Sequence, residues 1–398
     1  MIKRHRRHAR AGAWCVALAL ALAAVSAACR RAPQPGDPLP GLSKAERARF
    51  DSGRVAFENV FTPGTGLGPL FNADGCAECH EEPVAGGAGD EIERHAAAFH
   101  ATPPAGARPC DELVALGGPV FQQRVTPALR AAVGIDSEPV PPEATAIAGR
   151  SSPDIFGFGL LDAVPDSEIL ARADPDDRDR DGISGRPNRF FDGRLGRFGR
   201  KAVVPTLREF NDGATVAEQG VTNPVALDEG TFGGRPFPPG TDPTPEPELS
   251  REAIDLVDFF VRLLAPPAPQ RLSREARQGR DAFASAGCDG CHVPVLHTGD
   301  SPIRALQHRE VAAYTDLLLH DMGAELADIC FANATPSEFR TEPLMGVRLM
   351  TRFLHDGRAT TLEQAIELHN GEAARSRDRF RTLPAEERAA LVAFLKTL

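Results

Sequence analysis

The chain has 398 residues, of which 42% are hydrophobic and 25% are charged, and its formal net charge is −10 at pH 7. Residues 1–28 contain five cations and no acids, so the rest of the chain carries 40 basic and 55 acidic residues, a net charge of −15. This length favours two or more domains with packed cores. The negative charge disfavours nucleic acid as a partner and favours a positively charged protein.

The first 29 residues have the pattern of an export signal peptide. A basic start is followed by an apolar run that is short for a membrane span, and then by small residues before Cys29. Two processing routes stay open. Lipid attachment at Cys29 is supported by the Pro-rich tether at 30–41, whereas plain cleavage is supported by Ser26, which stands where a lipobox has Leu. Both routes predict a periplasmic or cell-envelope protein.

Two copies of one short motif dominate the rest of the sequence. Residues 76–80 and 288–292 both read C-x-x-C-H, the attachment signature of c-type haem. In this motif both thiols bond to the haem and the histidine ligates the iron. The residues so assigned are Cys76, Cys79, His80, Cys288, Cys291 and His292. A four-cysteine zinc site is the alternative, although zinc does not require the two histidines. The sequence therefore predicts two haem c groups.

Each motif lies in a repeated unit. A charged helical pattern with serine at its N-cap precedes each one, over Ser43–Phe57 and Ser273–Phe283, and both patterns end in Gly-Arg-x-Ala-Phe. Amphipathic helices that contain residues 256–260 and 391–395 close the units. Helix, haem motif, loops and closing helix form the plan of a small cytochrome c. We therefore expect a mainly α fold with two cytochrome c-like haem domains in tandem.

The repeat sets the expected domain boundaries. The first haem domain covers residues 42–265 and the second covers residues 270–398, with a Pro-rich linker between them. The first domain is the longer one because of a large insertion at about 100–250, which is rich in Gly, Pro, Asp and Arg. We expect long ordered loops with short helices there, and the clearest helix signal covers Asp166–Ala173.

The chain has eight cysteines, and two of them lie outside the leader, the anchor position and the haem motifs. These two are Cys110 and Cys330. A disulfide between them suits an oxidising periplasm, and two buried free thiols are the alternative.

Longer stretches of the chain resemble known families. The bacterial di-haem cytochrome c peroxidases and the MauG proteins resemble this chain in three places: 338–344, 352–358 and 361–366. A closer resemblance, to the di-haem oxidoreductase/peroxidase family also labelled thiol oxidoreductase-like, rests on four places: 67–72, 156–161, 196–202 and 318–323. The resemblance covers the mature chain. It implies peroxidase-like reduction of a small oxidant with electrons from a partner such as a small cytochrome, and the label alone adds oxidation of protein thiols.

The resemblance also implies roles outside the two motifs. In the peroxidases a Met ligates the second haem fourteen residues after the His of a His-x-Gly segment, and counting from His355 that position is His369. Leu362, Ile366 and His369 share one face of an expected helix, so we expect His369 to ligate the second iron. Ligation by two histidines would lower the potential of a site that has a high potential in the peroxidases. His355 resembles the histidine between the haems, and Arg358 is expected to pair with a propionate, while an ordinary turn residue is the alternative for both.

The first haem is expected to carry the chemistry. Peroxide reduction needs an open sixth position and a group that moves a proton between the oxygens. Glu218 resembles the distal Glu of the peroxidases, and a solvent-facing Glu is the alternative. His95 or His100 could instead ligate this iron, which would make the protein a non-enzymatic electron carrier. Outside the leader the chain has no Trp and a single Tyr, Tyr314. MauG-like storage of oxidising equivalents, which uses a Trp and a Tyr ligand, is therefore not expected.

One acidic segment indicates a further cofactor. Asp177, Asp179 and Asp181, followed by Gly182, fit the start of a calcium loop, D-x-D-x-D-G. Carboxylates at alternate positions can converge on one hard cation. A full loop would have Glu at its twelfth position, where Asn188 stands. Calcium is the predicted cofactor here, and a solvated acidic turn is the alternative.

Overall fold

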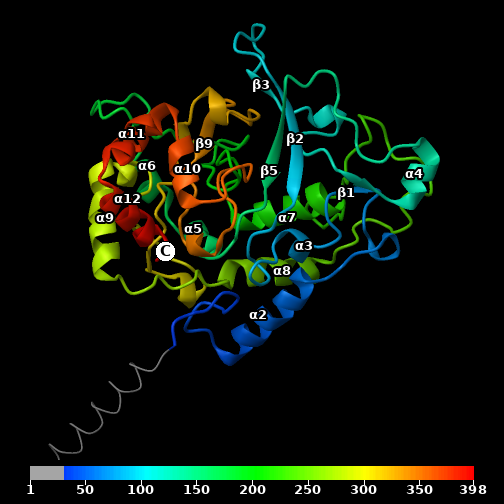
Figure 1. Cartoon of the computed structure of the whole chain (residues 1–398). Helices are drawn as coiled ribbons and strands as arrows, with labels where there is room; N and C mark the ends of the chain where they lie inside the picture. The colour runs from blue at the N-terminus through cyan, green and yellow to red at the C-terminus, as the bar shows by residue number, and fades with distance from the viewer. Residues whose placement is uncertain (1–30) are drawn as a thin grey trace, which may run out of the picture.

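The computed structural model describes residues 31–398, so the leader and Cys29 lie outside the described residues. This part of the chain is mainly helical with four small antiparallel sheets (Figure 1). The α-helices are α2 (Lys44–Phe57), α3 (Cys76–Cys79), α4 (Pro127–Val133), α5 (Phe158–Asp162), α6 (Asp166–Leu170), α7 (Leu207–Gln219), α8 (Arg251–Leu263), α9 (Arg274–Ala286), α10 (Leu362–Leu368), α11 (Ala374–Thr382) and α12 (Ala385–Leu395). The strands are β1 (Leu70–Phe71), β2 (Ile92–Phe99), β3 (Cys110–Asp111), β4 (Arg124–Val125), β5 (Ala146–Ser151), β6 (Leu296–His297), β7 (Glu310–Val311), β8 (Leu319–Asp321) and β9 (Glu338–Arg340). Among residues 31–398, none of the helices has the length and apolar character of a membrane span.

The helices predicted before and after each haem motif are confirmed. α2 begins after Ser43, whose hydroxyl accepts a hydrogen bond from the Glu46 amide, and α9 begins after Ser273, whose hydroxyl accepts one from the Ala276 amide. The closing segments lie within α8 and α12. In each unit the first helix packs across the closing helix, α2 on α8 and α9 on α12 (Figure 1).

Glycine in the repeated Gly-Arg-x-Ala-Phe segment makes both helix crossings possible. A Cβ on Gly53 would lie 2.4 Å from the backbone oxygen of Leu256, and a Cβ on Gly279 would lie 1.8 Å from that of Ala390. Only a residue without a side chain allows such a close approach. The repeat in the sequence therefore encodes a repeated contact between helices.

Replacing Gly279 by Ala is expected to lower the free energy of unfolding by about 1–3 kcal/mol, because the new methyl group overlaps the backbone of α12. Gly213 is the matched control, since it lies in the middle of α7 and an added Cβ would have no atom within 4 Å. Alanine at Gly213 should stabilise the protein by up to about 1 kcal/mol. Urea unfolding followed by circular dichroism measures both variants, and effects of the same sign would contradict this account.

The phenylalanine that ends each repeated segment connects the helix pair to the haem motif. The ring of Phe57 lies 6.4 Å from that of His80, and the ring of Phe283 lies 6.4 Å from that of His292. Each of these phenylalanines also packs on a phenylalanine of the closing helix. The two motif histidines thus have equivalent supports.

The insertion contains more regular structure than predicted. It holds the long helix α7 and the strand β5, which pairs with β2 just before the insertion so that His95 lies opposite Ala148, and none of these elements was expected. α6 ends at Leu170 rather than at Ala173. β2 is rich in alanine, which has a low preference for strands, and α7 contains Asn, Asp and Gly, so tertiary packing rather than local propensity selects both elements.

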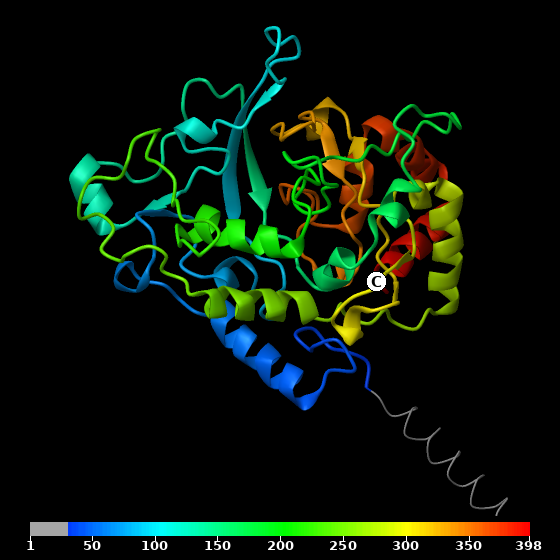
Figure 2. The ribbon, with the colours of Figure 1, turned by 180° about the vertical axis from the view of Figure 1, so that it is seen from behind.

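The insertion also joins the two predicted domains. The backbones of Arg186 and Leu319 exchange hydrogen bonds of 2.9 and 2.8 Å, and a disulfide with an S–S distance of 2.00 Å links Cys110 to Cys330. Figures 1 and 2 show the loops between α6 and α7 lying against the C-terminal part of the chain. One hydrophobic core contains Phe260 of the first unit together with residues of the second unit such as Leu318. The start of the chain packs there too, because residues 37–39 pair with the end of α8.

Candidate functional site

The two C-x-x-C-H motifs adopt the same turn. The His80 amide donates to the Cys76 carbonyl at 3.1 Å, and the His292 amide donates to the Cys288 carbonyl at 3.0 Å. All four motif cysteines are free. Burial raises the pKa of Cys76 to about 11 and that of Cys288 to about 12. The thiols are therefore neutral at pH 7, unlike the thiolate of a redox C-x-x-C pair.

The zinc alternative is not supported by the positions of the cysteines. Across residues 31–398, the groups of three or more side chains whose ligand atoms lie within 4.8 Å of one another contain carboxylates only. The two cysteine pairs therefore do not converge on one ion.

Both motif histidines are oriented for iron. The Nδ1–H group of His80 donates to the carbonyl of Pro153 at 2.9 Å, and that of His292 donates to the carbonyl of Tyr314 at 3.0 Å. This bond fixes the tautomer and leaves Nε2 free to bind a metal. Burial lowers the pKa of His80, and it lowers that of His292 to about 4. Both rings are thus neutral, as a metal ligand must be.

His369 faces His292 across a cavity in the second unit. The ring centroids lie 6.5 Å apart with an angle of 50° between the planes. Two imidazoles bound on opposite sides of one metal ion, at about 2 Å per bond, keep their centroids roughly 6 Å apart. The Nδ1–H group of His369 donates to the Ala365 carbonyl at 2.7 Å, so its Nε2 is free as well. One expectation is wrong: α10 ends at Leu368, and His369 caps the helix instead of lying on its face.

The walls of this cavity fit a haem group. They are largely apolar and include Phe283, Leu344, Val347, Met350, Phe353, Leu354, Leu362, Ile366, Leu391 and Leu395. Arg200 and Arg340 also line the cavity, and neither was predicted. Arg340 is 5% exposed, and its Nη1 has no hydrogen-bond partner. A buried guanidinium with a free donor fits a carboxylate such as a propionate.

The predicted propionate partner, Arg358, lies elsewhere. It is exposed, pairs with Asp356 and donates to the Glu325 carbonyl at 3.0 Å. It does not line the cavity. The resemblance identified Arg358, whose side chain makes its contacts outside the cavity. Arg340 lies in the cavity wall instead.

Glu218 lies beside the first haem motif. It is the penultimate residue of α7, and its Oε2 accepts a hydrogen bond of 2.8 Å from Asn72. The next residue, Gln219, brings its Nε2 to 4.0 Å from Cys76 Sγ. Burial raises the pKa of Glu218 well above its usual range, and the charge of Glu93 adds to the effect. A carboxyl group with a raised pKa is therefore placed next to the first motif.

The two other candidate ligands of the first iron differ in their surroundings. His95 is buried in β2, where Nε2 is bonded to Glu93 at 3.2 Å and Nδ1 has no partner. His100 is exposed at the end of the sheet. The buried side-chain oxygens of Ser152 and Gln219 also have no hydrogen-bond partner. These oxygens are therefore available to form hydrogen bonds with a group bound at the first site.

His355 lies in the wall of the second cavity. Its ring stacks on Phe339 at 4.4 Å and lines the second cavity, and burial lowers its pKa to about 4. Its carbonyl accepts a hydrogen bond of 2.9 Å from the Ser151 amide. Two residues later, Pro153 accepts the hydrogen bond from His80. This short segment connects His355 with the first motif, while the predicted role of His355 stays a prediction.

Two groups of carboxylates lie in the insertion. In the predicted calcium loop, oxygens of Asp177, Asp179 and Asp181 lie within 4.8 Å of one another. The loop backbone donates to the same side chains, as in the bond of 3.2 Å from the Gly182 amide to Asp177. The convergence fits the predicted cation, and calcium binding there stays a prediction.

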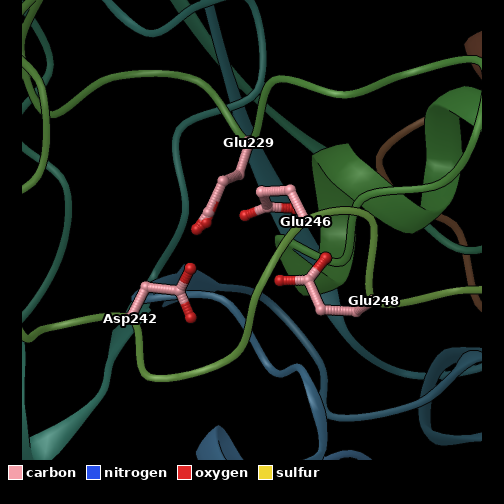
Figure 3. Close-up of side chains that lie close together, drawn as sticks. All are labelled: Glu229, Asp242, Glu246 and Glu248. Atoms are coloured by element: carbon pink, nitrogen blue, oxygen red, sulfur yellow. The ribbon is translucent and has the colours of Figure 1, made fainter.

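The second group was not predicted. Glu229, Asp242, Glu246 and Glu248 come from two loop segments and point toward one another (Figure 3). Both oxygens of Glu229 are buried without a hydrogen-bond partner. Burial, followed by the neighbouring negative charges, raises the pKa of Glu229 to about 8. Burial and the hydrogen bond with Glu248, followed by the neighbouring negative charges, raise the pKa of Glu246 to about 8.

The raised pKa of Glu229 predicts a pH-dependent stability. The folded chain binds the Glu229 proton more tightly than the unfolded chain does. Binding of this proton therefore adds to the free energy of unfolding below about pH 4.5, and this stabilisation is lost as the pH rises toward 8. Glu229→Gln should therefore raise the melting temperature more at pH 8 than at pH 5. Glu143→Gln, at an exposed glutamate of the same insertion, is the control. Calorimetry of metal-free protein checks this, and an equal effect at both pH values would contradict it.

The two motif turns, each with an oriented histidine, fit a protein that holds two haem groups. Residues 139–398 match the family described as "Di-haem oxidoreductase, putative peroxidase", and the chain belongs to that family. Cytochrome c551 peroxidase of Nitrosomonas europaea is 28% identical over 127 residues, which is 32% of this chain and 35% of that relative. The match thus spans about a third of the curated relative.

Two solved structures are similar at low identity. One is a MauG-like protein associated with microbial copper homeostasis, with a TM-score of 0.41, 17% identity and coverage of 93% of each chain. The other is the di-haem peroxidase BthA of Burkholderia thailandensis, with a TM-score of 0.41, 15% identity and coverage of 92% of this chain and 89% of that one.

Proposed function

We propose that the protein is a di-haem c oxidoreductase of the cell envelope that reduces peroxide or another small oxidant at its first haem site. Electrons would reach that site from a partner protein through the second haem site. The family supports the general class. The observation that carries the finer proposal is Glu218, a carboxyl group with a raised pKa beside the first motif.

The side chains around the two sites would do different work. When bound, haem iron supplies the electrons and the position at which an oxidant binds. Glu218 moves a proton between the oxygens of the oxidant, and Asn72 orients its carboxyl group. In the second unit, His292 and His369 close both sides of the site against ligands. Arg340 would hold a propionate, and His355 would pack between the sites.

A spectroscopic measurement on the haem-loaded protein tests this proposal. Electron paramagnetic resonance and absorption spectra are recorded as isolated and half-reduced, with and without cyanide. One high-spin signal that cyanide perturbs, together with peroxide consumption that depends on a reduced donor, is expected. Two low-spin signals that do not respond to cyanide would reject it.

The second candidate function is an electron carrier with both irons six-coordinate. His95 favours it, because this buried imidazole has an unpartnered Nδ1. His95→Ala separates the two functions. A carrier would gain a high-spin signal in this variant, whereas a peroxidase would already have that signal.

The cell-envelope location and the partner rest on sequence features. We propose export, with a lipid anchor at Cys29, and a donor with a basic surface that complements the negative charge of this chain. A protein that stays in the soluble fraction whether or not Cys29 is replaced by Ser would reject the anchor. A rate of reduction by the donor that does not fall with salt would reject the basic partner.

Calcium at Asp177, Asp179 and Asp181 is also a proposal. Bound calcium should raise the melting temperature, because a ligand that binds only the folded state stabilises it. Asp179→Asn should abolish most of this rise. Glu246→Asn is the matched control in the other carboxylate group, and a rise that survives Asp179→Asn would place the ion elsewhere.

A further inference from the structure

His320 is a buried histidine to which the proposed function gives no role. It lies in β8 with 3% of its surface exposed. Its Nε2 lies 2.8 Å from Asp316 Oδ2, and its Nδ1 lies 2.9 Å from Glu372 Oε2. A neutral imidazole has one N–H group and cannot donate to both carboxylates. The geometry therefore requires the doubly protonated, positively charged ring. Burial opposes this charge, but the bonds to the two carboxylates raise the pKa of His320 well above its usual value.

The charged ring borders the covalent edge of the second haem site. His320 lines the same cavity as His292 and His369. Its Nδ1 lies 3.6 Å from Cys291 Sγ, the sulfur that would carry the haem. Among the described residues, this sulfur has a hydrogen-bond contact with His320 and with neither of the two carboxylates. The charges of Asp316 and Glu372 also act on this sulfur, but the charged group in direct contact with it is the positive ring.

The ring is held by two carboxylates of the second predicted domain, and one of them is held in turn by the first domain. Asp316 is 2% exposed, and its second oxygen accepts the Leu318 amide at 2.9 Å. Glu372 accepts two hydrogen bonds from Ser184 of the insertion, 2.6 Å from the hydroxyl and 2.9 Å from the amide. An imidazolium fixed in this way cannot turn away from the Cys291 sulfur, so its electrostatic field stays directed at this edge of the site. Such a preorganised charge is more effective in a buried site than in water.

We propose that His320 is a positioning residue that keeps a fixed positive charge against the Cys291 edge of the second haem site and thereby raises its reduction potential. A nearby cation disfavours the oxidised iron, which carries one more positive charge than the reduced iron. Ligation by His292 and His369 acts in the opposite direction, because two histidines lower the potential relative to Met/His. The inference rests on the proposed function, because a tuned potential at the second site matters only if electrons pass from the second site to the first.

Two variants with opposite expected signs test this proposal. His320→Gln removes the charge and keeps a hydrogen-bonding side chain, so the midpoint potential of the low-spin second site should fall. Asp316→Asn removes one anion. At pH 5, below the ordinary pKa of an imidazole, the remaining pair with Glu372 keeps the ring charged, so the potential should rise. A merely structural role would shift the potential in the same direction in both variants, because a disturbed site admits water. Spectroelectrochemical titration of the di-haem protein at pH 5 gives the potentials.

An exposed histidine provides the control. His297 pairs with Glu168 at 3.1 Å on the surface, and His297→Gln should leave the potential unchanged. Shifts no larger than this control, or shifts of the same sign in both test variants, would overturn the proposal. If His320→Gln fails to hold its second haem, Asp316→Asn alone decides: a rise supports the proposal, and any other result overturns it. The titration measures potentials and not peroxide turnover. It therefore still tests the role of the His320 charge if the protein proves to be an electron carrier and the proposed peroxidase function fails.

Discussion

Replacing Glu218 by Gln should lower kcat/KM for peroxide by about 10²–10⁴-fold, the usual contribution of a general acid or base. The amide keeps the shape of the side chain and can still bond to Asn72, but it cannot release or take up a proton. The haem spectra should therefore stay unchanged. Stopped-flow measurement of peroxide consumption, with the absorption spectrum as a check on haem content, gives the comparison.

The pH profile separates a proton-transfer role from a structural role. Burial holds the pKa of Glu218 well above its usual value, so the protonated form persists to a higher pH than in an ordinary glutamate and is lost as pH rises through the raised pKa. The rate of the natural protein should fall over that range, and the rate of Glu218→Gln should not. Glu209→Gln, at a surface ion pair with Arg194 on the same helix, is the control. Unchanged turnover in Glu218→Gln would reject the role.

The parts of the molecule that could be predicted from the sequence are those that local rules determine. The C-x-x-C-H turns need only five consecutive residues. The starts of α2 and α9 follow from Ser43 and Ser273, whose hydroxyl groups cap amides three residues later. The repeated Gly-Arg-x-Ala-Phe segment also contained Gly279, and its close contact with α12 gives the repeat a physical reason.

The parts that could not be predicted depend on distant segments. His320 lies in a stretch that resembles the family, but its charge comes from Asp316, four residues away, and from Glu372, 52 residues away. Arg340 is one of many arginines, and only the folded chain shows its unpartnered Nη1 in the cavity wall. β2 carries no strand pattern because its central residues are alanines. Its place is set by pairing with β5, more than 40 residues further along the chain.

Replacing His369 by Ala should convert the second site from low spin to high spin. His292 and His369 face one another at a distance that suits a shared iron, and alanine would leave the sixth position to water or an added ligand. Electron paramagnetic resonance and cyanide titration measure the change. His308→Ala, at an exposed histidine paired with Asp300, is the control. A low-spin signal that persists in His369→Ala would show that another residue ligates this iron.

Replacing His369 by Met tests the same ligand through the potential. Methionine can restore the low-spin state, and it should raise the midpoint potential because thioether ligation favours reduced iron. The change acts at the iron, whereas His320→Gln acts at the Cys291 edge, so the two shifts should add if the contributions are independent. The double variant would then return toward the natural potential. A double variant that retains the whole increase from methionine would mean that His320 contributes nothing to this site.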